Sequence, residues 1–333
     1  MRFIIATVLL LSLFSPLTQA NTTLRIATLA PDGTSWMQIM RKAADDIQNE
    51  TEGRVRIRYF PGGIQGSDKS VLRKMQIRQL QGGAVASGAL AHITNMTQLY
   101  SLPFTFRNLD EIRAVRAQYD HYIANALAEQ GYILLGLSEG GFAYLMSNSP
   151  LRTSADVRNK KVWMPEGDVI SQTIFTNGQV NPTALPISDV YTSLQTGLID
   201  TLAVNPSSAI ALQWHTRLNY ATDYPLVFLF GMLVVDARAF NTINNDDQAT
   251  VRRIMAEAFQ AMDVQNEQDE QGARAALQQN GLEFVALSDE DKAAWRQLAA
   301  DSINSLRERN VYPVDTYNQL IDSLQSLRNG VAE

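Results

Sequence analysis

The chain carries few side chains of the kinds used in covalent or metal chemistry. Its 333 residues include no cysteine and only three histidines, His92, His121 and His215, none of them three or four positions from another. The absence of cysteine excludes disulfides, thiol catalysis and cysteine-ligated zinc. The sequence also lacks a G-x-G-x-x-G after its first expected strand, a G-K-[ST] phosphate loop and a G-x-S-x-G elbow. We therefore expect no enzyme activity, no metal site and no cofactor.

A tryptophan at the end of a short strand is better suited to molecular recognition. Val162 to Met164 reads as a strand halfway along the chain, stopped by Pro165, which cannot donate to a strand ladder. Strand ends that turn into helices are where open α/β sheets present ligand-contacting side chains. Trp163 offers a large apolar ring with one N–H donor. We expect Trp163 to form an aromatic wall of a ligand site; a ring packed against a hinge is the alternative.

Alternating strands and amphipathic helices fill the first half of the chain. Apolar spacing and capping residues predict a β-α-β-α-β rhythm over residues 24–87, typical of a parallel sheet with helical crossovers. The expected elements are strands 24–29, 54–60 and 84–87 and helices 36–51 and 67–80. A helix over 108–130 and two strands, 132–137 and 143–147, separated by Gly140 and Gly141, follow.

The same rhythm then restarts and ends in a long helix. The second unit comprises a short helix 153–157, the strand of Trp163, helices 169–177 and 188–196, and a strand 199–204. Ser188 is expected to cap the second of these longer helices. A strand 228–236 is expected to cross back to the first. The helix Asp246–Gln279 would be about 50 Å long, so it should span both units. The chain is then expected to end with a strand 282–286 and two helices. The first helix begins at a capping box, Ser288–Asp291, and reaches Arg309, and the second reaches Leu327.

The N-terminus and the charge balance bear on location and partners. The first 20 residues predict a signal peptide that is cleaved after Ala20 and directs export to a periplasm. They contain Arg2, an apolar run from Phe3 to Phe14 and the small-x-small cleavage sequence Thr18-Gln19-Ala20. The net charge of −6 and a pI near 5.2 argue against a nucleic-acid partner.

Several strings, in order along the chain, resemble the DctP-type solute-binding proteins of tripartite ATP-independent periplasmic (TRAP) transporters. They are Leu29–Pro31 with Trp36, Gly53–Val55, Phe60–Gly63 with Gly66–Ser67, Ser87–Leu90, Leu102–Arg107, Asn148–Thr153, Lys161–Glu166 and Asp189–Asp200. The resemblance implies a two-lobed periplasmic binding protein fold of the α/β class with mixed sheets, an interdomain cleft and a long helix spanning both lobes. We expect domain I to comprise residues 21–140 and about 228–262, and domain II about 141–227 and about 263–333.

The resemblance also implies a carboxylate clamp that this chain lacks. Most members place an arginine after the Lys-Val-type pair, which suits a bidentate bond to a substrate carboxylate, and here that position is Trp163. A second frequent arginine is replaced by Ala143, and Ala203-Val204 precede the Asn205-Pro206 turn without the usual acidic or amide residue.

Eight residues are candidates to line the cleft by their place after strands or in the matched strings. They are Trp36, Ser87, Tyr144, Trp163, Met164, Asn205, Trp214 and Phe228. Leu212 to His215 resemble a subgroup whose ligands look apolar or are unassigned. The leading hypothesis is a periplasmic receptor that delivers a small organic ligand, apolar or aromatic in part, to a TRAP permease. The alternatives are a sensor protein presenting its ligand to a receptor or to a tetratricopeptide-type partner, and a conventional carboxylate-binding receptor.

Overall fold

A parallel βαβαβ segment opens the part of the chain that the computed structural model describes, residues 21–330. Its elements are β1 (Thr22–Thr28), α1 (Ser35–Glu50), β2 (Val55–Phe60), α2 (Asp68–Gln76) and β3 (Gly82–Ala86). β1 pairs in parallel with both β2 and β3, as expected. The expected end of α2 at Leu80 is wrong, because Arg78 has a positive φ of 62° that breaks the helix. The predicted signal peptide and its cleavage site lie outside the described residues.

One long strand runs where two were expected. After two short 3₁₀ turns (Ser87–Leu90 and Asn95–Gln98) and α3 (Leu109–Glu129), β4 extends from Tyr132 to Ser147 without a break. Two register shifts interrupt its pairing, between Leu134 and Gly136 and between Glu139 and Gly141. Gly141 has a φ of 109°, so the glycine bends the strand rather than ending it.

Short strands and helices follow β4 and form the second lobe. They are β5 (Trp163–Pro165), α4 (Val169–Asn177), β6 (Thr183–Leu185), a 3₁₀ turn (Ile187–Asp189), α5 (Val190–Thr196), β7 (Thr201–Val204), α6 (Pro206–Ala211), a 3₁₀ turn (Trp214–Arg217) and β8 (Tyr220–Thr222). Residues 153–157 form turns, so the helix expected there is wrong. Ser188 lies inside the 3₁₀ turn and does not cap α5, which begins two residues later than expected.

The last third of the chain returns to the first lobe and back again. It contains β9 (Val227–Asp236), α7 (Ala237–Phe240), α8 (Asn245–Gln279), β10 (Glu283–Val285), α9 (Asp289–Glu308) and α10 (Val314–Gly330). The capping box at the start of α9 is present, with Ser288 and Asp291 bonding each other's backbone N–H groups. α8 has 35 residues, about 52 Å, and contacts α1 of the first lobe and α6 of the second, which confirms the predicted spanning helix.

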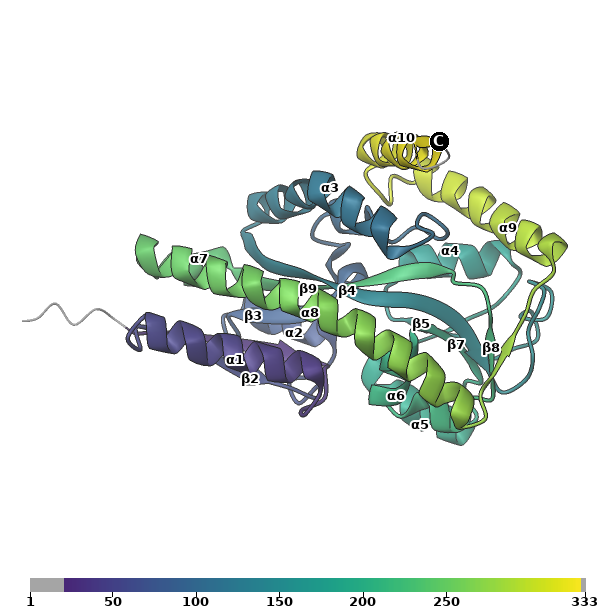
Figure 1. Cartoon of the computed structure of the whole chain (residues 1–333), viewed down its shortest axis with the longest axis horizontal. Helices are drawn as coiled ribbons and strands as arrows, with labels where there is room; N and C mark the ends of the chain where they lie inside the picture. The colour runs from purple at the N-terminus through teal and green to yellow at the C-terminus, as the bar shows by residue number, and fades with distance from the viewer. Residues whose placement is uncertain (1–20, 331–333) are drawn as a thin grey trace, which may run out of the picture.

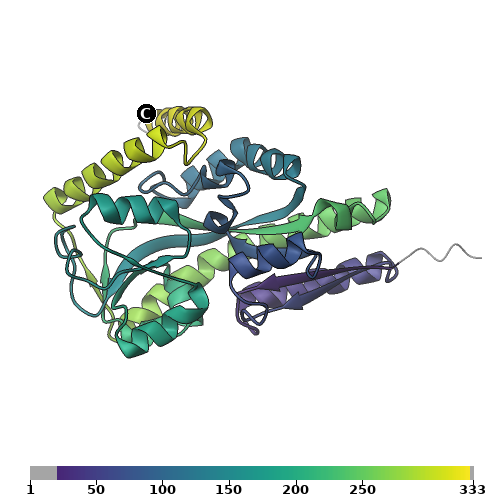
Figure 2. The ribbon, with the colours of Figure 1, turned by 180° about the vertical axis from the view of Figure 1, so that it is seen from behind.

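A single mixed sheet continues through both lobes. Its strand order is β10-β8-β4-β9-β3-β1-β2, with β7 also paired to β4, while β5 and β6 form a separate parallel pair. β9 pairs antiparallel with both β3 and β4, so β4 and β9 are the strands that pass between the lobes. α8 crosses in front of these strands in Figure 1 and lies behind them in Figure 2, where α2 faces the viewer. The sheet therefore separates α8 from α2.

Candidate functional site

The strands that pass between the lobes position three aromatic side chains. Phe142 pairs with Phe228 across β4 and β9, and their rings meet edge to face with centroids 4.9 Å apart. Tyr144 follows two residues after Phe142 and therefore lies on the same face of β4. Gly141 lies against the Glu270 side chain of α8, and its φ of 109°, which other residues rarely adopt, requires the glycine. The bulge at Gly141 thus lies where α8 passes β4.

Trp163 is buried at the start of β5. Its side chain packs edge to face on Trp214, with ring centroids 5.5 Å apart, and the residue is 5% exposed. The indole Nε1–H donates to the carbonyl oxygen of Leu185 at 3.0 Å. Two of the eight candidates are therefore in direct contact, and the only polar group of Trp163 is bonded within its own lobe. The neighbouring candidate Met164 is also 5% exposed.

One ion pair joins the two lobes beside β5. Lys69 Nζ of α2 lies 2.8 Å from Glu166 Oε1, in the turn that follows β5. The residue before Lys69, Asp68, accepts a bond from the Ala86 N–H at the end of β3 at 3.1 Å. Burial raises the pKa of Asp68 to about 6. These contacts bring α2, the end of β3 and the turn after β5 together.

Asn205 connects the second lobe to α8 and to β4. Its Nδ2 group donates to the Gly140 carbonyl oxygen at 2.7 Å, to Ser207 Oγ at 2.9 Å and to Glu270 Oε1. Glu270 Oε1 also accepts from the Ser207 N–H at 3.2 Å and from its hydroxyl. Burial raises the pKa of Glu270, although these neutral donors oppose the shift. Asn205 is 2% exposed, so its amide serves this network.

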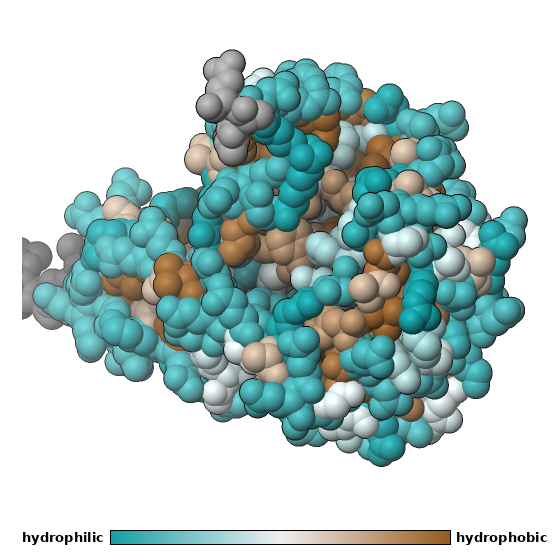
Figure 3. All heavy atoms as spheres, turned by 45° about the vertical axis from the view of Figure 1, so that its right-hand side comes forward, coloured by the Kyte–Doolittle hydropathy of each residue, from teal (hydrophilic) through white to brown (hydrophobic). Residues whose placement is uncertain are grey.

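A cavity of about 190 Å³ lies between α8 and the aromatic face of β4 and β9. Of the predicted site residues, Tyr144 and Phe228 line it. The other lining residues come from the start of α3, β4, α6 and α8 and include Leu109, Glu139, Phe142, Pro206, Glu267 and Glu270. In a space-filling view, the surface has a hollow with hydrophobic residues at its floor and hydrophilic residues around it (Figure 3).

Ion pairs between α3, β4 and α8 border the same cavity. Arg116 Nη1 lies 2.7 Å from both Glu139 Oε1 and Asp263 Oδ2. Arg113 Nη2 lies 2.8 Å from Glu267 Oε2 and 3.4 Å from Glu139 Oε2. Burial raises the pKa of Glu139, and Arg116 opposes that shift. Two arginines thus neutralise three of the four carboxylates that line the cavity.

The remaining two candidates lie in the first lobe, apart from these clusters. Trp36 is half-buried and meets Tyr59 edge to face at 6.5 Å, in the core of α1 and β2. Ser87 is 8% exposed and its hydroxyl bonds that of Ser101 at 3.3 Å. The structure brings Trp163 together with Trp214, and Tyr144 together with Phe228, but it joins neither Trp36 nor Ser87 to either pair.

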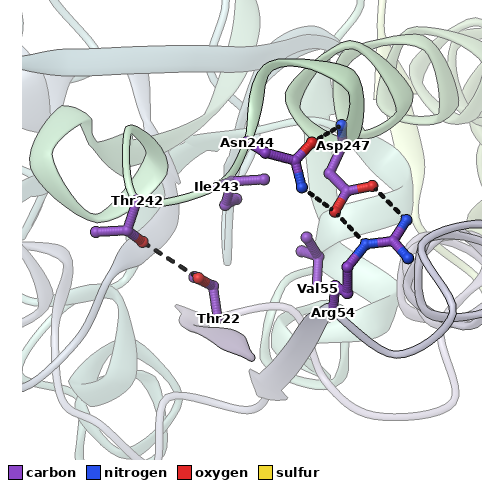
Figure 4. A pocket seen from close by; sticks show the side chains of 7 residues that line it. All are labelled: Thr22, Arg54, Val55, Thr242, Ile243, Asn244 and Asp247. Carbon is purple, nitrogen blue, oxygen red and sulfur yellow. Dashed lines mark hydrogen bonds and ion pairs between the residues drawn. The ribbon is translucent and has the colours of Figure 1, made fainter. Parts of the chain in front are cut away.

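A second, smaller cavity of about 90 Å³ lies far from these residues, at the start of α8 (Figure 4). Arg54 bonds both oxygens of Asp247, through Nε at 2.8 Å and Nη2 at 2.9 Å. Asn244 caps α8 by accepting from the Asp247 N–H at 2.9 Å and donates to its carboxylate at 2.7 Å. The guanidinium of Arg54 and the amide of Asn244 thus both donate to the carboxylate of Asp247. We therefore interpret this cluster as a structural link between the start of β2 and α8.

Sequence reasoning missed Glu270, Arg116 and Glu139. The helical period identified α8 but gave no reason to select one of its many acidic residues, and Glu139 lay between two expected strands. Across residues 21–330, no three metal-binding side chains come together and no helix has the length and apolarity to cross a membrane.

Comparisons with known proteins agree with this architecture. An uncharacterized protein, YiiZ, of Salmonella typhimurium is 28% identical over 214 residues, which cover 63% of this chain and 64% of that protein, less than two thirds of its length. The C4-dicarboxylate-binding periplasmic protein DctP of Rhodobacter capsulatus is 22% identical over 262 residues, 78% of each chain.

Solved structures share the fold over nearly the whole described chain. A TRAP periplasmic solute-binding protein from Shewanella oneidensis with bound succinate has a TM-score of 0.85 at 17% identity, covering 92% of this chain and 100% of that one. A second, from Xanthobacter autotrophicus with bound β-D-galacturonate, has a TM-score of 0.84 at 20% identity, covering 91% and 99%. These likenesses confirm the two-lobed α/β fold class with a mixed sheet.

The family model described as DctP, bacterial extracellular solute-binding protein, family 7, matches residues 26–310. This family consists of solute-binding receptors, which agrees with the expectation that the protein is not an enzyme. The chain belongs to bacterial extracellular solute-binding protein family 7.

Proposed function

We propose that the protein is a periplasmic receptor of a TRAP transporter, which captures a small organic acid between its lobes and delivers it to the membrane permease subunits. The observation that carries the proposal is the family match over residues 26–310, together with a fold whose lobes are joined by β4, β9 and α8. Solved proteins of this fold carry succinate, β-D-galacturonate or orotic acid, as their descriptions state. The signal peptide predicted over residues 1–20, with cleavage after Ala20, accords with a periplasmic location.

We further propose that the ligand depends less on its carboxylate, and more on an apolar or aromatic part, than the ligands of most members. Position 163 holds a tryptophan whose single donor is already bonded to Leu185, so this position offers no guanidinium fork. Ala143 offers no charge either. Lys69, the cation at the junction of the lobes, is paired with Glu166. The chain would thus belong to an atypical subgroup without the carboxylate-binding arginine.

The proposed cleft lies at the junction between α2, the end of β3 and the end of β5. Ser87, Met164 and the edge of Trp163 belong to elements of that junction, and opening of the Lys69–Glu166 pair would expose them to a ligand. Trp214 would support Trp163 from behind, whereas Trp36 and Asn205 have other partners, Tyr59 and Glu270. The proposed domains are residues 21–140 with about 228–262, and about 141–227 with about 263–333, so that the division crosses β4, β9 and α8.

The ligand can be identified directly. Mass spectrometry of gently purified protein should detect a bound organic acid with an apolar or aromatic part, and isothermal titration with a panel of acids should rank such compounds above dicarboxylates. A panel in which only small dicarboxylates such as succinate bind would contradict the apolar preference while leaving the receptor function intact. Failure of every organic acid to bind would contradict both.

The delivery step needs its own experiment. Uptake of the identified ligand by vesicles containing TRAP permease subunits should require the receptor. Ligand-dependent capture of a sensor domain or a tetratricopeptide-type partner, without receptor-dependent uptake, would instead support the alternative role in signalling.

A further inference from the structure

The cavity between α8 and β4 is separate from the proposed cleft. It is walled by α8, which lies on the opposite side of the sheet from α2 (Figures 1 and 2), whereas Lys69 and Glu166 meet beside α2. Neither Trp163 nor Met164 is among the residues that line it. Its volume of about 190 Å³ corresponds to roughly six water molecules at liquid density, enough for a small organic ion.

Glu270 differs from the other carboxylates of this cavity. Glu139, Asp263 and Glu267 each pair with Arg113 or Arg116 within 3.4 Å. Glu270 has no ion pair within the described range of 21–330, and its bonds, from Asn205 and Ser207, all reach Oε1. The second oxygen, Oε2, therefore has no protein partner in that range, and it is not buried, since no buried side-chain oxygen lacks a partner there.

Aromatic rings line the same cavity as this free oxygen. Phe142 and Phe228 line the cavity as an edge-to-face pair, and Tyr144 lies beside them. The faces of such rings attract a cation and bury its hydrocarbon part. Arg274 also lines the cavity, but it pairs with Asp223 at 2.8 Å and lies over Phe284 and Tyr144, with Cζ 3.8 Å and 5.5 Å from their ring centroids. The cavity therefore combines an unpaired anion with apolar walls, and the arginine that lines it, Arg274, is already paired with Asp223.

We propose that this cavity is a second binding site, for a small organic cation whose ammonium group bonds Glu270 and whose hydrocarbon part packs on Phe142 and Phe228. The cavity would disfavour anions, because its four lining carboxylates outnumber the three arginines beside them, Arg113, Arg116 and Arg274, and Arg274 is already paired with Asp223. The site would thus differ from the cleft both in position and in the charge of its ligand, and it does not depend on which acid the cleft binds.

Benzylammonium is a suitable probe, with benzyl alcohol as its uncharged counterpart. Isothermal titration of the full chain should show saturable binding of benzylammonium, and benzyl alcohol should bind at least about tenfold more weakly, because it carries no positive charge to pair with the Glu270 carboxylate. Glu270→Gln should weaken benzylammonium binding at least about tenfold while retaining an acceptor for Asn205. Glu257→Gln, the same change at an exposed position of α8, should alter it less than about twofold.

A co-crystal structure with benzylammonium supplies the positional test, with density expected beside Glu270. The proposal is overturned if the wild-type protein shows no saturable binding, if benzyl alcohol binds as tightly as benzylammonium, or if Glu270→Gln behaves like Glu257→Gln. Density between α2 and β5 would also overturn it, and would assign the probe to the cleft. The alcohol comparison uses only the wild-type protein, so the proposal stays testable should Glu270→Gln fold poorly.

Discussion

Trp163→Ala should lower the free energy of unfolding substantially, because the indole ring is packed in the core of the second lobe. The side chain is 5% exposed, packs on Trp214 and satisfies the Leu185 carbonyl oxygen. Truncation of a buried tryptophan to alanine costs about 3–5 kcal/mol, since it removes apolar contacts and leaves a cavity. For roughly 310 ordered residues, that loss corresponds to a fall in Tm of about 5–8 °C if both lobes unfold together.

Two matched variants separate the contributions. Trp163→Phe keeps an apolar ring but loses the N–H donor to Leu185, and should cost about 1–2 kcal/mol. Trp36→Ala removes an indole that is half-buried, so it should cost less than Trp163→Ala. Urea unfolding followed by circular dichroism measures all three, with a differential scan for Tm. A Trp163→Ala protein whose free energy of unfolding changes by less than about 1 kcal/mol would refute the assignment of the ring to the core.

Three further changes test charged groups. The pKa of Asp68 is raised by burial to about 6, above its ordinary 3.8, so its neutral form adds stability below pH 4 that is lost as the pH rises through 6. The free energy of unfolding of Asp68→Asn should therefore exceed that of the parent protein by at most about 3 kcal/mol at pH 7 and should equal it near pH 4. Urea unfolding at both pH values measures the difference. A gain at pH 4 that disappears at pH 7 would contradict the conclusion that burial raises this pKa. Asp247→Ala should cost about 2 kcal/mol, because Arg54 loses both of its bonds to that carboxylate, and an unchanged urea midpoint would argue against the structural link. Lys69→Ala should change the free energy of unfolding by less than about 1 kcal/mol, because the pair with Glu166 is solvent-exposed; a loss above about 2 kcal/mol in the same assay would show that the pair is buried in solution.

Local sequence signals determined much of the fold. The alternation of Val55, Ile57 and Tyr59 and the helical spacing of Met40, Ala43 and Ile47 correctly predicted β2 and α1. Such signals concern residues within one or two turns of each other, where side-chain period and capping decide the structure. The length of α8 also follows from an uninterrupted period and by itself predicted contact with both lobes.

Conformations set by packing were harder to predict. Gly140 and Gly141 were expected to separate two strands, but continuous pairing with β9 outweighs the local weakness of glycine and keeps β4 as one strand. Residues 153–157 lack the length to hold a helix without tertiary support and form turns.

The sequence by itself determined the fold class, the family resemblance and the replacement of an arginine by Trp163. Only the tertiary structure decided what each side chain contacts. Trp163 meets Trp214 and Leu185, and Glu270 meets Asn205 across 65 positions of the chain. The physical reason is that strand and helix periods fix the face on which a side chain lies, whereas its partner depends on how distant elements pack, which no local period encodes.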